Sequence, residues 1–183
     1  MSITSDTVER LAQAYDAASA PAAFAALDTH AHATLGHTLC TINRHDAERM
    51  RVVRLYSSNP AAYPPGGSKD KRGTAWGRHV LLERKVFIGE GSDAIREFFD
   101  DHDAIQALGL QSVINVPVVF DGACLGTVNF LMPRAALAPA DIAAARLAGL
   151  LALPAFLALT PAFRSTRGGC GPTPCRSRPR SRR

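Results

Sequence analysis

Residues 108–131 constrain the fold of this chain more than any other stretch, because they predict two strands that are apolar on both faces. The strands flank Asp121-Gly122, a dipeptide that favours a two-residue hairpin turn with positive φ at both central positions. An antiparallel hairpin with one face in water would alternate apolar and polar residues. This pair does not alternate, so we expect it in the middle of a sheet that is covered on both sides.

The same hairpin carries two amides, Asn115 and Asn129, in the middle of otherwise apolar strands. The turn predicts a register in which Val118 lies opposite Leu125, and in that register the two amides point to opposite faces of the sheet. A buried amide without partners costs roughly 1 to 3 kcal/mol, so each must bond to backbone, water or a ligand. We therefore expect at most one of them to line a ligand pocket, and the sequence leaves open which.

The rest of the chain predicts a mixed α/β (α+β) fold. Hydrophobic periodicity, cap residues and turn residues indicate further elements in the following order: a helix from Asp6, a helix over 22–34, strands over 37–43 and 50–56, a long loop over 57–73, a helix over 74–84, a strand over 86–88, helical turns over 92–108, and a last helix over 139–159. The predicted architecture is a central antiparallel sheet of about five to six strands, covered by helices on both faces.

Length and charge fit one domain followed by a tail. A chain of 183 residues with 46% hydrophobic content can bury one sizeable core. Seven of the 21 basic residues are arginines within 164–183, a stretch without an acid, so the remaining 14 face 16 acidic residues and the folded part is about neutral. We expect a ligand-binding domain over residues 1–160 and an Arg/Pro/Gly-rich disordered tail over 164–183.

Cysteine usage and hydropathy bear on the compartment. Four cysteines do not make a disulfide framework at this length, and Cys40 and Cys124 lie in apolar runs, which is typical of buried free thiols. No signal peptide is recognisable, so a cytoplasmic protein is expected. The apolar stretch over 147–163 is shorter than the roughly 20 residues of a bilayer span. It favours a packed terminal helix, whose surplus apolar surface predicts a homodimer through the terminal helices.

The hairpin and the helix before it carry a family resemblance. The residues concerned are Leu108-Gly109, Ser112-Val113, Val116-Pro117, Asp121-Gly122 and Leu125-Gly126-Thr127-Val128. This pattern resembles the end of a GAF domain, and a looser similarity in the order of elements extends from about residue 5 to about residue 160. The resemblance implies a sensory, small-molecule-binding fold whose ligand lies between one sheet face and a covering segment, here residues 57–111. Ligands differ between branches of the family, so the cofactor is unknown.

Candidate pocket residues are aromatic and polar side chains near the start of the covering segment, together with the two strand amides: Tyr56, Tyr63, Trp76, Arg78, His79, Asn115 and Asn129. Aromatic walls with a few placed polar groups are typical of small-molecule pockets. Trp76 is the one tryptophan of the chain. It has an equally good interpretation as a core side chain, and the sequence leaves both open.

Several other functions are disfavoured. His30 and His32 are two apart on a predicted helix and point in different directions, so no metal site with His37 is expected. The arginine-rich tail comes without a nucleic-acid-binding motif, so neither a specific nucleic acid nor a membrane is an expected partner. Within the family, the stretch over 98–101 lacks the Asn-Lys and Asp-Glu pairs of the cyclic-nucleotide branch, and the covering segment lacks a cysteine that could attach a bilin.

Two alternatives to a ligand-binding sensory and regulatory domain remain. One is a redox enzyme of the free methionine sulfoxide reductase type, which would need an accessible thiolate and a nearby resolving thiol. No cysteine occurs between Thr41 and Ala123, so the covering segment has no such nucleophile. The other is a dimerisation scaffold with a filled pocket. No catalytic residues are assigned.

Overall fold

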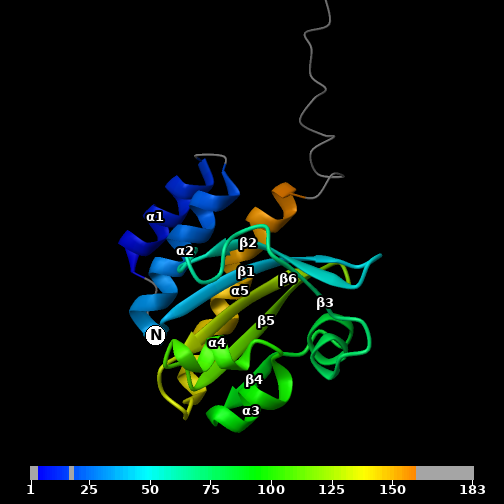
Figure 1. Cartoon of the computed structure of the whole chain (residues 1–183). Coiled ribbons are helices and arrows are strands. Elements are labelled where there is room, and N and C mark those ends of the chain that lie inside the picture. The colour runs from blue at the N-terminus through cyan, green and yellow to red at the C-terminus, as the bar shows by residue number, and fades with distance from the viewer. Residues whose placement is uncertain (1–3, 17–18, 160–183) are drawn as a thin grey trace, which may run out of the picture.

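One six-stranded antiparallel sheet organises the molecule (Figure 1). Its strands are β1 (Leu39–Asp46), β2 (Arg51–Ser57), β3 (Ser68–Asp70), β4 (Phe87–Glu90), β5 (Ser112–Phe120) and β6 (Ala123–Met132). They lie in the order β3-β2-β1-β6-β5-β4, which puts the β5–β6 hairpin well inside the sheet. The predicted fold class is confirmed. The computed structural model describes residues 4–16 and 19–159, so the tail predicted over 164–183 lies outside the described residues.

The β5–β6 turn forms as its sequence predicts, but the register behind it does not. Asp121 and Gly122 have φ values of 46° and 70°, as a turn with two positive φ angles requires. A β-bulge follows, because Val119 pairs with Cys124 whereas Val118 pairs with Gly126 instead of Leu125. The bulge shifts every later pair by one residue. The predicted Val118–Leu125 pairing is therefore wrong.

Three helices cover one face of the sheet: α1 (Ser5–Asp16), α2 (Ala20–Leu35) and α5 (Pro139–Leu159). Figure 1 shows α5 running behind the sheet, with α2 beside it and α1 outermost. The Ser19 side chain caps the start of α2, and Gly36, with φ of 56°, ends it. The core on this face contains Phe24, Phe130 and Phe156 among other buried side chains.

The last helix is not broken at Pro154, although proline removes a backbone hydrogen bond there. The Tyr15 hydroxyl of α1 donates a hydrogen bond to the Leu151 carbonyl, in the turn before this proline. By length and composition alone α5 could cross a membrane, with a mean hydropathy of 2.0, yet 39% of that apolar window is buried within the domain. Helices in the core of soluble proteins satisfy the same criterion, so the helix is weak evidence for a membrane.

Shorter elements cover the other face: the π-helical η1 (Gly77–Leu82), α3 (Gly91–Phe98) and α4 (His102–Ala107). They bury a second core around Trp76, Val80, Ile95 and Leu110. The segment over 57–73, predicted to be one loop, contains the short edge strand β3, which pairs with β2. Its residues Ser-Lys-Asp have little intrinsic preference for strands, so pattern analysis does not find it.

Candidate ligand-binding site

A cavity of about 70 Å³ lies between the sheet and the segment that covers this second face. One buried water needs roughly 10 to 15 Å³, so the space takes a molecule of a few non-hydrogen atoms. The lining residues come from the central strands, from the β2–β3 edge and from the covering segment: Leu39, Thr41, Asn43, Val52, Arg54, Tyr63, Lys69, Lys71, Trp76, Phe99, Asp101, Ile105, Asn115, Asn129 and Leu131.

Both strand amides line this cavity. Because of the bulge, Asn115 pairs directly with Asn129 across the hairpin, and its Nδ2 donates to Asn129 Oδ1 at 2.9 Å. Asn129 Nδ2 in turn donates to the Thr41 carbonyl and hydroxyl oxygens, at 3.1 and 3.2 Å. The prediction that the amides face opposite sides is therefore wrong. An amide nitrogen has two hydrogens, and Asn115 uses one of them in the hydrogen bonds found in the described part of the chain.

Trp76 covers the amide pair. Its indole nitrogen donates to Asn115 Oδ1 at 2.8 Å, and the side chain is only 4% exposed. Trp76 is thus both a core residue and a cavity wall, which joins the two interpretations that the sequence left open. Tyr63 forms another part of the wall, where burial and the neighbouring Asp101 carboxylate raise the pKa of its hydroxyl to about 12.

Cationic side chains enter the cavity from the β2–β3 edge. Lys69 forms an ion pair with Asp101, with 2.6 Å between Nζ and Oδ1. Burial would raise the pKa of Asp101, but the ion pair with Lys69 holds it below its usual value. Asp101 is the one acid among the lining residues, and it faces Arg54 and Lys71 as well as its partner Lys69. The lining therefore has more positive than negative charge.

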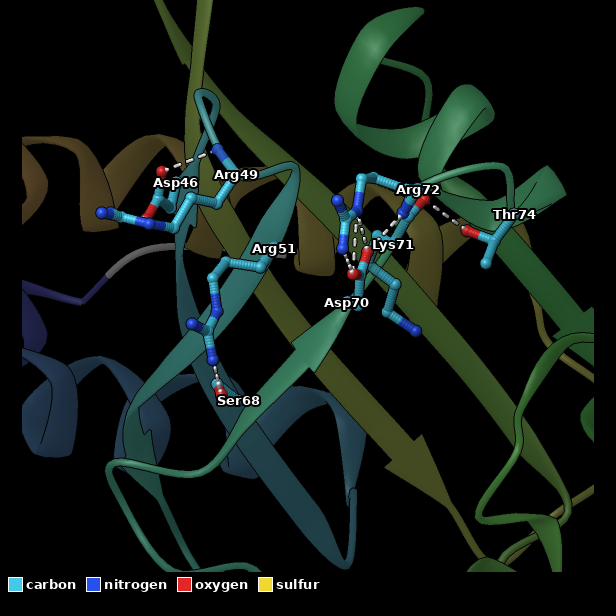
Figure 2. A network of polar contacts seen from close by, with 8 residues as sticks. All are labelled: Asp46, Arg49, Arg51, Ser68, Asp70, Lys71, Arg72 and Thr74. Carbon is cyan, nitrogen blue, oxygen red and sulfur yellow. Dashed lines mark hydrogen bonds and ion pairs between the residues drawn. The ribbon is translucent and has the colours of Figure 1, made fainter.

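Lys71 forms no ion pair among the described residues, although the charges of Asp100 and Asp101 partly oppose the lowering of its pKa. Its neighbours Asp70 and Arg72 pair with each other, with 2.9 Å between Arg72 Nε and Asp70 Oδ2. Figure 2 shows the Lys71 amine turned away from that pair. The amine lies 4.9 Å from the centroid of the Trp76 ring, in cation–π geometry. Lys71 is 7% exposed, and burial, followed by repulsion from Lys69, lowers its pKa.

Arg54 is the second of the cavity's cations that forms no ion pair with a described residue. One guanidinium nitrogen donates to the Pro64 carbonyl at 3.0 Å, and the group lies 5.0 Å from the centroid of the Tyr63 ring. Its Nε is buried and makes no hydrogen bond there. A buried donor without an acceptor costs free energy, so Arg54 has hydrogen-bonding capacity left for an acceptor in the cavity.

Tyr56, one of the predicted pocket residues, lies on the opposite face of the sheet. The β1–β2 pairing shifts between Ile42 and Asn43, and the Tyr56 hydroxyl donates to Asp28 Oδ2 at 2.7 Å under α2. Tyr56 therefore does not line this cavity. Asp28 also contacts His37, with 2.6 Å between Oδ1 and Nε2. Burial would raise the pKa of Asp28, but the hydrogen bonds from His37 and Tyr56 hold it below its usual value.

The contact between Asp28 and His37 is part of a group of potential metal ligands. Potential ligand atoms of Asp28, His37 and Cys40 lie within 4.8 Å of one another, a cluster that the sequence does not predict because Cys40 comes from the neighbouring strand β1. The carboxylate oxygens already accept hydrogen bonds from His37 and Tyr56. Burial, with Asp28 adding to it, raises the pKa of the Cys40 thiol well above its ordinary value. The cluster is therefore internally hydrogen-bonded.

Arg78 and His79 also lie outside the cavity. Both residues belong to η1, and neither is among the side chains that line the cavity beneath Trp76. Both line a surface groove bounded by Arg72, Gly73 and Phe98, and His79 Nε2 lies 3.1 Å from the Val86 carbonyl oxygen. Arg78 and His79 therefore do not share the cavity of Trp76.

The sequence does not predict the charged residues of the cavity, which are Arg54, Lys69, Lys71 and Asp101. No motif marks them. Lys69 lies on the unpredicted edge strand β3 and Lys71 directly follows it, whereas Arg54 lies on β2 and Asp101 just before α4. Gly77 is the one residue near Lys71 whose type indicates close packing there. A Cβ at this position would overlap the Lys71 carbonyl oxygen, so the glycine allows η1 to pack against the backbone of Lys71.

Comparisons with known proteins agree on the fold. No family model matches the sequence, and no curated protein does. Among solved structures, the chain is similar to a fragment of a methyl-accepting chemotaxis protein (residues 122 to 287), with 19% identity and a TM-score of 0.65 over 87% of this chain and 99% of that one. It is similar to the GAF domain of a phosphoenolpyruvate-protein phosphotransferase from Acinetobacter, with 16% identity and a TM-score of 0.67 over 92% and 98%.

A third similar structure is a protein with bound biliverdin in its far-red-absorbing dark state, with 10% identity and a TM-score of 0.63 over 85% of this chain and 98% of that one. At these identities the likeness concerns the fold. The antiparallel sheet, the helices on both faces and the extent of these alignments lead to the same conclusion: this chain has the fold of a GAF domain.

Proposed function

We propose that this protein is a sensory or regulatory domain that binds a small organic molecule in the cavity beneath Trp76. The observation that carries the proposal is the lining itself, in which buried amides, cations and aromatic rings converge on a space that side chains leave open. Burying so many polar groups around a space is costly unless something bonds to them. A ligand would supply the missing partners.

The similar structures support the sensory part of this proposal. By their descriptions they come from a chemotaxis protein, a phosphotransferase and a biliverdin-binding protein. Biliverdin itself is far larger than the cavity of about 70 Å³, and residues 57–111 contain no cysteine. We therefore propose a ligand of a few non-hydrogen atoms.

The redox alternative receives no support from Cys40 and Cys124, the two cysteines among the described residues. Burial raises the pKa of Cys124 to about 11, and it raises the pKa of the fully buried Cys40 well above its ordinary value. Both thiols are therefore protonated at neutral pH, whereas the chemistry needs a thiolate. A scaffold with a filled pocket is also disfavoured, because such a pocket would be packed with apolar side chains rather than cations and amides.

Native mass spectrometry of the purified full chain tests the proposal, because it detects neutral and charged ligands alike. We expect a fraction of the protein to carry a co-purified small molecule that gentle activation releases. The variant Ile105→Phe, which enlarges a side chain of the cavity wall, should lose it. The matched control Ile88→Phe adds the same ring at an exposed position outside the cavity and should keep it. Equal occupancy in both variants would contradict the proposed site.

A further inference from the structure

The charges of the cavity indicate the chemical class of its ligand, an inference that rests on the proposed function. Of the cations that line it, only Lys69 has a carboxylate partner in the described part of the chain, because Asp101 pairs with it and Asp70 pairs with Arg72. Lys71 is left with the face of the Trp76 ring, and Arg54 with a backbone carbonyl and the Tyr63 ring. Asp101 attracts both charges and Asp100 also attracts Lys71, but neither acid forms an ion pair with Lys71 or Arg54 among the described residues. A buried cation such as Lys71 is costly without a directly bonded anion, and the half-buried Arg54 adds a second positive charge beside it.

The position of these groups suggests how that charge is balanced. Lys71 and Arg54 come from the β2–β3 side of the cavity, whereas Asn115 and Asn129 come from the central strands. An anionic group between the two sets would accept hydrogen bonds from the Lys71 amine and the Arg54 guanidinium. The free N–H of Asn115 lies on the same cavity. Hydrogen bonds between such cations and a carboxylate are about twice as strong as neutral ones.

Another part of the cavity wall is apolar, and it indicates the chemical nature of the uncharged part of the ligand. Leu39, Leu131 and Ile105 line the cavity together with the Trp76 ring. They form a surface for a short hydrocarbon body, and the volume of about 70 Å³ limits it to a few carbons. An inorganic oxyanion would satisfy the cations but leave this apolar wall without a partner.

We propose that the cavity binds a small aliphatic carboxylate, with its carboxylate group at Lys71 and Arg54 and its hydrocarbon part against Trp76 and Leu131. Free phosphate and sulfate are also anions and could bind the same cations, so the test includes both. The proposal assigns to Lys71 the central role, because its amine lines the cavity without an ion pair in the described residues.

The test compares acids with their neutral isosteres. Isobutyrate and isobutyramide, and propionate and propionamide, have nearly the same shape and differ in charge. Binding is measured by isothermal titration calorimetry and by the fluorescence of the single tryptophan. We expect at least one acid to bind about tenfold or more tightly than its amide, and more tightly than phosphate or sulfate.

Two lysine variants then test whether Lys71 binds the carboxylate group of the ligand. Lys71→Met should remove most of the difference between acid and amide, whereas the control Lys85→Met, at an exposed lysine paired with Glu83, should leave it unchanged. Amides that bind as well as acids, no acid that binds, inorganic anions that bind better than the acids, or an unchanged preference in Lys71→Met would each overturn the carboxylate inference. The proposed function fails separately, if native mass spectrometry finds no difference between the cavity-filling variant and its control.

Discussion

The hydrogen bond between Trp76 and Asn115 should contribute measurably to the stability of the cavity wall. Replacing Trp76 by Phe removes the indole N–H and leaves Asn115 Oδ1 without its donor at a site where Trp76 is 4% exposed. The unsatisfied acceptor costs about 1 to 3 kcal/mol, and the lost ring atoms add about 1 kcal/mol. We expect Trp76→Phe to lower the free energy of unfolding by about 2 to 4 kcal/mol, or roughly 4 to 16 °C in melting temperature for a domain of this size.

A double-mutant cycle with Asn115→Ala isolates the hydrogen bond from the change in ring size. Asn115→Ala already removes the acceptor, so Trp76→Phe in that background should cost about 1 to 2 kcal/mol less than in the wild type. Urea denaturation followed by circular dichroism measures all four proteins. The control cycle pairs Trp76→Phe with Tyr56→Phe, whose hydroxyl bonds to Asp28 on the opposite face of the sheet, and should be additive. Additivity within about 0.5 kcal/mol in the first cycle as well would refute the reasoning.

Three further predictions concern the rest of the domain. Gly126→Ala should cost about 2 to 4 kcal/mol in urea denaturation, because its Cβ would overlap the Asn43 carbonyl and the Phe156 ring; a loss below about 0.5 kcal/mol would contradict the bulge geometry. The chain should be a dimer in light scattering at micromolar concentration, and Leu150→Glu, at a 70% exposed position of α5, should make it monomeric; a monomeric wild type would exclude that interface. The folded-state pKa of Cys40 is raised, so its contribution to stability is full below the unfolded pKa of about 8.5 and is lost as pH rises above it. The stability difference between wild type and Cys40→Ala should therefore shrink from pH 7 to about pH 10, and a constant difference would argue against a buried thiol.

The sequence is sufficient to predict the fold because its strongest signals are local. The Asp121-Gly122 turn, the Gly36 end of α2 and the apolar faces of the hairpin each require one backbone conformation, and the structure has them. The side of the sheet on which a residue lies depends on pairing between strands. One bulge near Gly126 and one shift after Ile42 are enough to reverse the predicted faces of several residues.

The site is less predictable for the same reason. Asn115 and Asn129 were recognised as unusual because a buried amide needs a partner, but the bulge brings them to one face. Lys71 and Arg54 are ordinary residues in sequence, and their importance comes from which acids are already paired with other cations. Such pairing is a property of the tertiary structure, so no local pattern predicts it.

The central claim, that the space beneath Trp76 is a ligand site, is tested most directly by nuclear magnetic resonance of the indole group. The chain has one tryptophan, so its ¹H–¹⁵N spectrum contains a single indole cross peak. The low-molecular-weight fraction of a cell extract, added to ligand-stripped protein, should shift that peak together with the side-chain amides of Asn115 and Asn129. The Ile105→Phe variant should not respond. An indole peak that stays in place in the wild type, while the spectrum changes only at surface residues, would contradict the account.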